Sequence, residues 1–190
     1  DRDPETGLNT ETPALRPQPP EQPPVYRLSR AFHSAVFEPS SALFKPIQRF
    51  MQFVDSSRRS TGALHFFERC SKTSLYGCKD CGDCALSDAA YLCPVSQCPK
   101  DQRNAPCGGS YEGWCEVYPG EKPCIWVRAY LRLKAQRREH EIGENVVPPC
   151  DWDLWQTSSW INYFLGRDHG SKRLGIRPPD PGKAPAAGPK

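Results

Sequence analysis

The feature that most constrains the fold is a cysteine-rich segment from Cys78 to Cys124, which holds eight of the ten cysteines in this 190-residue chain. It opens with Cys78, Cys81 and Cys84, each separated from the next by two residues. Thiolates at this spacing are typical of metal sites, because one loop can wrap several corners of a metal centre. We therefore expect one small apolar core, partly replaced by metal.

Composition and charge narrow the class of protein. The formal charge of +3 comes from 25 basic and 22 acidic residues, a balance too even to favour nucleic acid or anionic lipid. No apolar run approaches the roughly 20 residues of a transmembrane helix, and the first residues lack the pattern of a signal peptide. We expect a cytoplasmic protein without membrane contact, whose cysteines hold metal; a lost signal peptide would reopen a disulfide interpretation.

The expected fold class is a small, mainly α and irregular, metal-stapled cysteine-rich domain with an extended proline-rich N-terminal arm and a disordered C-terminal tail. Prolines in the arm and tail leave too little apolar sequence for a packed core. The expected regions are a proline-rich linker or arm (1–26), short amphipathic helices (27–69), the cysteine-rich metal-binding core (70–124), a supporting basic helix with an aromatic docking helix (125–170) and the tail (171–190).

Helical periodicity predicts the elements that flank the cysteines. Apolar residues recur at three- and four-residue steps over 28–54, which predicts two short helices, the second capped by Ser40 or Ser41 with Pro46 in its first turn. An apolar run over 64–76 leads into the cysteines and is expected to support them. The segment 125–142 has the pattern of the strongest helix, with a basic side expected to be solvated or to meet an acidic partner.

Aromatic residues gather in the segment 152–165, which predicts a further helix. Asp151 or Asp153 is a candidate cap and Gly166 a candidate stop. This much aromatic surface must be buried, either in the chain's own core or in a partner protein.

The cysteine spacing favours two four-thiolate sites. The opening run resembles that of ferredoxins, in which a loop wraps a cubane cluster, and its fourth ligand would be Cys93 or Cys98, each followed by proline. The other of these two, with Cys107, Cys115 and Cys124, could hold a second cluster, a zinc ion or an incomplete site. A site of zinc alone, or a metal that only staples the fold, stays an alternative.

Residues near the cysteines add two expectations. Gly108 and Gly109 follow Cys107 and would let backbone N–H groups reach sulfur. Cys70 and Cys150 lie outside the regular block and are expected to be free or auxiliary.

Catalytic patterns are scarce. The four histidines are scattered without a nucleophile at a recognisable spacing, and the chain has no glycine-rich dinucleotide fingerprint. We expect no catalysis by this chain alone and regard each histidine as an ordinary surface or core residue: His33, His65, His140 and His169.

One long stretch resembles a known family. The sequence CGDCALSDAAYLCPVSQCPKDQRNAPCGGSYEGWCEVYP, followed by CIWVRAYLRLK, closely resembles the C-terminal cysteine-rich domain of methylenetetrahydrofolate reductases, which also exists as a separate MetV-type accessory subunit. The likeness is strong over 76–134 and looser through TSSWINYFLGRDH. It does not include the proline-rich arm.

This resemblance implies an accessory iron–sulfur subunit or domain in one-carbon metabolism. The cluster, of the 4Fe–4S type, would relay electrons to a flavin-containing barrel partner or support it, and zinc or a second cluster would fill the other site. The FAD or FMN and the tetrahydrofolate substrate would bind the partner, since a barrel takes about 250 residues; a ferredoxin or an NAD(P)H-oxidising subunit would supply electrons. The implied ligands are Cys78, Cys81, Cys84, Cys93, Cys98, Cys107, Cys115 and Cys124.

A zinc-stapled module that binds protein or nucleic acid, without a redox role, is the alternative from another class. Salt-sensitive binding to nucleic acid would favour it.

Overall fold

The computed structural model of the chain describes residues 4–5, 24–144 and 146–179. Most of the proline-rich arm and the end of the tail, 180–190, lie outside the described residues. The elements are helices, one short hairpin and long irregular loops. In the described part of the chain, no helix is long and apolar enough to cross a membrane.

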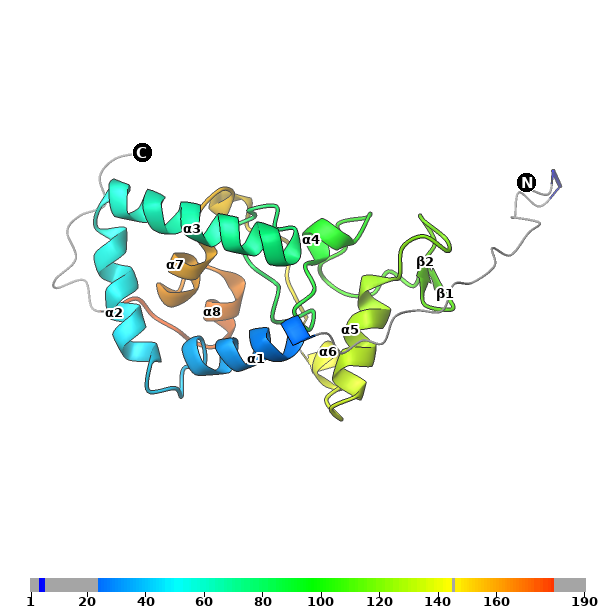
Figure 1. The fold of residues 1–190 in the computed structure, drawn as a ribbon, viewed down its shortest axis with the longest axis horizontal. Helices are drawn as coiled ribbons and strands as arrows, with labels where there is room; N and C mark the ends of the chain where they lie inside the picture. The colour runs from blue at the N-terminus through cyan, green and yellow to red at the C-terminus, as the bar shows by residue number, and fades with distance from the viewer. Residues whose placement is uncertain (1–3, 6–23, 145, 180–190) are drawn as a thin grey trace.

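Three helices frame one half of the molecule. Figure 1 shows α1 (Pro24–Val36), α2 (Phe44–Asp55) and α3 (Arg58–Tyr76) around the short helices α7 (Ser159–Phe164) and α8 (His169–Arg173). The apolar residues of α2 recur every three or four positions and so form one side of the helix. This side packs against α7. Their buried cluster consists of Phe37, Phe44, Met51, Val54, Ile161, Phe164 and Leu165.

A second core lies under α5 (Ile125–Lys134) in the other half. The expectation of a single core was therefore wrong, because the cysteine loops separate two apolar clusters. The second cluster consists of Tyr26, Ala89, Ala90, Leu92, Cys98, Ile125, Trp126, Ala129 and Leu133.

Short elements complete the fold around the cysteines. The one-turn helix α4 (Pro94–Gln97) follows Cys93. Strands β1 (Ser110–Tyr111) and β2 (Trp114–Cys115) form an antiparallel hairpin in which Ser110 faces Cys115. The helix α6 (Glu141–Glu144) and the 3-10 turn η1 (Trp152–Leu154) lie in the connection to α7.

The two helices predicted over 28–54 are present as α1 and α2. However, α1 begins at Pro24, and Tyr26, assigned to the arm, is buried with 2% of its surface exposed. The predicted serine cap of α2 is wrong in position: Leu43 occupies the N-cap, and the Ser41 hydroxyl accepts a hydrogen bond from the Leu43 N–H.

The longest helix among the described residues is α3, which joins the end of the region assigned to short helices (27–69) to the apolar run over 64–76. Its apolar residues Phe66, Phe67 and Leu75 are exposed, whereas its charged residues Glu68 and Lys72 are buried. The helix is therefore turned with a polar pair toward the interior, opposite to the usual amphipathic arrangement.

The basic helix is shorter than predicted. It ends at Lys134, because the chain turns through a left-handed conformation at Arg137 (φ 57°), with the Arg138 N–H bonded to the Leu133 carbonyl. Its basic side is not wholly solvated either. Arg132 is 4% exposed and donates to the Ala90 carbonyl.

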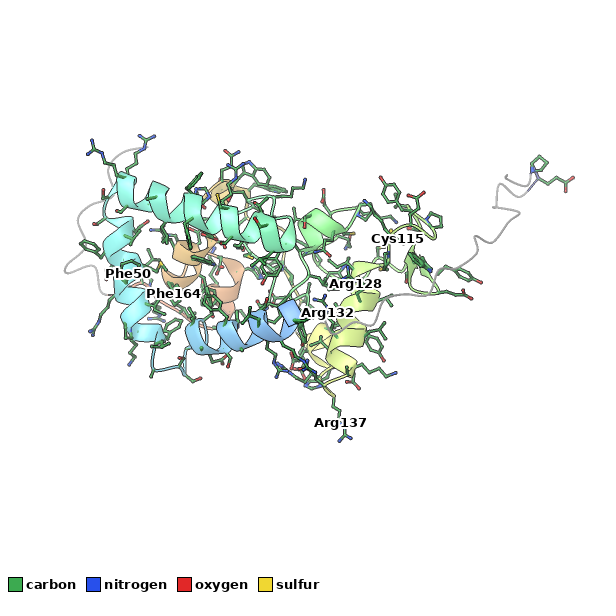
Figure 2. All side chains as sticks on the ribbon, in the orientation of Figure 1. Phe50, Cys115, Arg128, Arg132, Arg137 and Phe164 are labelled. Atoms are coloured by element: carbon green, nitrogen blue, oxygen red, sulfur yellow. The ribbon has the colours of Figure 1, made fainter. Side chains whose placement is uncertain are left out.

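The aromatic segment divides into η1 and α7, and α7 is buried in the chain's own core. Asp151 caps η1, Ser158 caps α7, and Gly166 adopts a positive φ just after α7. Phe164 points into the frame of helices, whereas Phe50 on α2 points away from it (Figure 2). The residues assigned to the tail begin inside α8, and the Arg177 carbonyl accepts a bond from a side chain of α2.

Candidate metal centre

Four cysteines line one small cavity between α3 and α4. Cys78, Cys81 and Cys84 lie on the loop that leaves α3, and Cys93 lies immediately before α4; the cavity has a volume of about 20 Å³. The helix ends at Gly77, whose φ of 64° turns the chain into the loop. Of the two candidates for the fourth ligand, the structure places Cys93 at this cavity.

The surroundings of these thiols are those of a buried group. Burial raises the pKa of Cys81 and Cys93, and the neighbouring Cys84 raises both further. Burial also raises the pKa of Cys78, against the lowering effect of Lys72. Thiols in such a position stay neutral unless a cation or hydrogen-bond donors compensate the thiolate charge.

Hydrogen-bond donors already face two of the sulfur atoms. The Asp80 N–H lies 3.3 Å from Cys78 Sγ, and Lys72 Nζ lies 3.4 Å from Cys84 Sγ. Hydrogen-bond donors of this kind stabilise thiolates and tune the properties of a metal centre that the thiolates bind.

A buried ion pair holds Lys72 in place. Glu68, 3% exposed, lies 3.2 Å from Lys72 Nζ through Oε1. The hydroxyls of Ser158 and Ser159 donate to the Glu68 carboxylate, both at 2.6 Å. Because these serines begin α7, the carboxylate also lies at the positive end of that helix. Helix α7 is thus fixed to the wall of the cysteine cavity.

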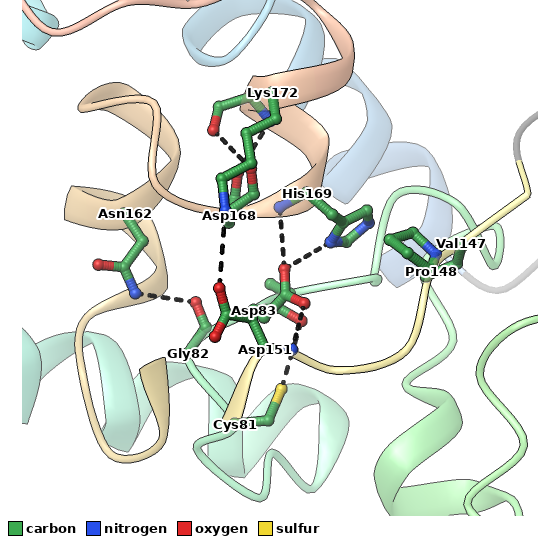
Figure 3. A network of polar contacts seen from close by, with 12 residues as sticks. Cys81, Gly82, Asp83, Val147, Pro148, Asp151, Asn162, Asp168, His169 and Lys172 are labelled. Carbon is green, nitrogen blue, oxygen red and sulfur yellow. Dashed lines mark hydrogen bonds and ion pairs between the residues drawn. The ribbon is translucent and has the colours of Figure 1, made fainter. Parts of the chain in front are cut away.

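Asp83, between Cys81 and Cys84, is the centre of a second buried network (Figure 3). Its carboxylate contacts Arg103 Nη2 at 2.8 Å, the His169 N–H at 3.0 Å and the Asp151 N–H at 3.1 Å. Burial opposes ionisation of Asp83, but hydrogen bonds from the side chain and N–H of His169 and from the Asp151 N–H outweigh it and hold the pKa of the carboxyl well below its usual range.

His169 continues this network toward α8. Its Nδ1 lies 2.5 Å from Asp83 Oδ1 and its Nε2 lies 3.1 Å from Asp88 Oδ2. Burial lowers the pKa of His169, but hydrogen bonds to the two carboxylates prevail and raise it to about 9. The imidazole is therefore a charged bridge at neutral pH. It connects the cysteine loop to α8, whereas the sequence alone indicated an ordinary surface or core histidine.

Arg103 links the two groups of cysteines. It lies between Cys98 and Cys107 in sequence, and its guanidinium donates to the Asp83 carbonyl at 2.7 Å and to the Pro148 carbonyl at 3.2 Å. The segment between Cys98 and Cys107 is thereby hydrogen-bonded to the loop that carries Cys81 and Cys84.

Three of the other four implied ligands lie at the hairpin, and the fourth, Cys98, lies at the end of α4. Cys107 precedes β1 and accepts a hydrogen bond from the Gly109 N–H at 3.4 Å, as the glycines after it predicted. Cys115 lies on β2, and the Cys124 N–H bonds to the Gly113 carbonyl between the strands. Cys98 is buried in the core cluster against which Cys124 packs.

The donor chemistry suits metal, although the sulfur atoms are not arranged for it in advance. Within the described ranges, no three Cys, His, Asp or Glu side chains form a ready group of metal ligands. The cavity has room for about one water molecule. Asp80 Oδ2, on its wall, is buried without a hydrogen-bond partner. Four thiols with backbone donors therefore fit an iron–sulfur cluster or zinc in composition.

The two cysteines set aside in the sequence differ from each other. Cys70 is exposed on α3. Cys150 lies within hydrogen-bonding reach of Cys81, and burial raises its pKa. Cys150 is therefore a fifth thiol near the cavity, brought there by the chain that leads to η1.

A wider cavity of about 570 Å³ adjoins the first and is lined by α1, α3, α7 and α8. Cys84 and Lys72 lie on the walls of both cavities. Exposed apolar side chains, among them Phe32, Phe67 and Leu75, lie along it. Cys84 is thus the thiol that borders an open apolar surface.

Comparison with known families identifies the segment that carries these features. A family model described as methylene-tetrahydrofolate reductase C terminal matches residues 58–153. The chain belongs to this family. The match begins at the first residue of α3 and spans all ten cysteines. No curated protein and no solved structure matches the chain.

Proposed function

We propose that this chain is the accessory iron–sulfur module of a methylenetetrahydrofolate reductase, relaying electrons to a flavin-containing catalytic partner. The observation that carries the proposal is the lining of one cavity by Cys78, Cys81, Cys84 and Cys93, inside the segment that matches the reductase family. Cysteine thiolates in this number are the ligands of a [4Fe–4S] cluster, which transfers single electrons.

The chain's own residues have distinct roles in this proposal. The four cysteines hold the cluster, the Asp80 N–H and Lys72 donate to ligand sulfurs, and Asp83 fixes the loop between two of the ligands. The second group would hold a further cluster or zinc with Cys98, Cys107, Cys115 and Cys124.

Relay and structural support are separate functions, and each has an observation in its favour. Cys84 borders the wide apolar cavity, which gives a cluster at this site a short route to a partner and favours the relay. The connection of both cysteine groups through Arg103 favours support, because a metal would fasten loops between two small cores. The two functions can coexist.

The partner in this proposal carries FAD or FMN and the folate site. A (β/α)8 barrel of about 250 residues exceeds the length of this chain, so flavin and folate would bind a second subunit or another part of a longer polypeptide. A ferredoxin-like protein or an NAD(P)H-oxidising subunit would supply the electrons.

Anaerobic purification followed by iron, sulfide and zinc analysis tests the proposal. We expect a brown protein with a broad visible absorption and about four iron and four sulfide per cluster. We also expect a flavoprotein to copurify from the source cells. Colourless protein containing only zinc would overturn the iron–sulfur assignment and favour the zinc-stapled binding module.

A further inference from the structure

Lys72 combines burial with direct contact to a proposed ligand. It is 8% exposed, and its Nζ lies 3.4 Å from Cys84 Sγ, within the range of hydrogen bonds to sulfur. A buried lysine is costly unless its charge is compensated. The contact with a cysteine at the edge of the cavity is therefore a specific arrangement rather than a chance position on a solvated helix.

All three N–H donors of the ammonium have partners. Glu68 Oε1 lies 3.2 Å from Nζ, Ser159 Oγ lies 2.6 Å from it, and Cys84 Sγ is the third acceptor. Glu68 is in turn held by two serine hydroxyls at the start of α7. The ammonium cannot turn away from the sulfur without losing a buried hydrogen bond.

The position of the charge has a consequence for redox chemistry. The reduced form of a cluster carries one more negative charge than the oxidised form, so a cation beside a ligand sulfur stabilises the reduced form more. Hydrogen bonds to ligand sulfurs and local charge are the main means by which a protein sets a cluster's reduction potential. Burial leaves this interaction weakly screened by water and salt.

We propose that Lys72 is a positioning and tuning residue, whose hydrogen bond to Cys84 raises the reduction potential of the group held by Cys78, Cys81, Cys84 and Cys93. Glu68 orients the Lys72 ammonium, and its negative charge partly offsets the positive one. Glu68 therefore limits how far Lys72 raises the reduction potential. The inference rests on the proposed function and identifies how that site is adjusted.

Redox titration of the anaerobically purified chain, monitored by electron paramagnetic resonance, measures the effect. The signal of this site is the one that disappears in Cys81→Ser. We expect Lys72→Met to shift its midpoint potential to more negative values, and Glu68→Gln to shift it to more positive values. A change that merely loosened the fold would not move the midpoint in opposite directions.

Two further variants keep the test independent of folding. Lys72→Met leaves Glu68 buried without its cation, so the double variant Glu68→Gln/Lys72→Met removes both charges; we expect its midpoint to lie below that of Glu68→Gln alone. Lys79→Met is the matched control, since Lys79 follows Cys78 directly but is exposed. Solvent screening should leave its midpoint nearly unchanged.

The outcomes separate this inference from the proposed function. Wild-type protein without iron and sulfide would overturn the proposed function and the tuning role with it. Variants that retain wild-type iron and sulfide but show an unchanged midpoint would overturn the tuning role alone. A shift in Lys79→Met as large as that in Lys72→Met would also overturn it, because overall charge rather than the hydrogen bond would then decide the potential.

Discussion

Gly82 lies at a tight point of the cysteine loop, where the backbone passes close to η1. Its φ is 71°, and a Cβ placed on it would lie 1.8 Å from the Leu154 carbonyl oxygen. Only glycine fits this conformation and this contact without displacement of backbone. The loop between Cys81 and Cys84 therefore needs glycine at this position to pass η1.

Replacement of Gly82 by alanine is expected to destabilise the protein by about 2 kcal/mol or more, from the left-handed backbone and the clash together. Urea denaturation under anaerobic conditions measures this. The control is Gly62→Ala in α3, where a Cβ meets nothing within 4 Å; there we expect stabilisation of up to about 1 kcal/mol. Equal effects of the two substitutions would contradict the account of the loop.

His169 predicts a dependence of stability on pH. Its pKa is raised to about 9 in the folded chain from 6.5, so its contribution is fully present below about pH 6.5 and is lost as pH rises through 9. The free energy of unfolding should therefore fall from pH 6 to pH 9.5 more steeply in the wild type than in His169→Gln. Parallel pH profiles would show that His169 does not bridge the two carboxylates.

At the scale of elements, α2 and α7 depend on each other for burial. Phe164 on α7 is completely buried against α2, whereas Phe50 on α2 is 54% exposed. Phe164→Ala should cost about 3–5 kcal/mol, because it leaves a cavity between the helices. Phe50→Ala, the same chemical change on the outer side, should cost less than about 1 kcal/mol. Thermal unfolding of the two variants compares them directly.

The sequence predicted those elements that show an apolar period. The steps of three and four residues gave α1, α2 and the start of α5. It did not show α3 as one long helix, because the buried face of α3 is the charged pair Glu68 and Lys72. A pair of opposite charges four residues apart is usually a solvated surface pair, and only α7, about 90 residues later, makes it an interior one.

Contacts between residues that are distant in sequence also limited prediction of the site. Spacing identified the cysteines as candidate ligands and left Cys93 and Cys98 as alternatives for the fourth. The residues around them are distant in sequence: His169 meets Asp83 across 86 positions, and Arg103 meets it across 20. Such contacts leave no local pattern, and Cys150 was set aside because its approach to Cys81 depends on the same folding.

At the scale of the whole molecule, the two apolar cores should respond differently to loss of metal. The cluster of α2 and α7 contains no cysteine, whereas the core under α5 includes Cys98 and lies against Cys124. Removal of iron by a chelator should therefore speed amide hydrogen exchange in 78–93 and 107–124 and leave α2 and α7 protected. Uniformly faster exchange would indicate one cooperative unit instead.

The central claim is that the cavity cysteines hold an iron–sulfur cluster, and the most direct measurement is the iron and sulfide content of single cysteine variants purified without oxygen. We predict iron and sulfide in the wild type, the same amounts in Cys70→Ser, and a loss of about four iron and four sulfide per chain in Cys84→Ser. Cys84→Ser with the wild-type content, or wild-type protein with neither iron nor sulfide, would contradict the claim.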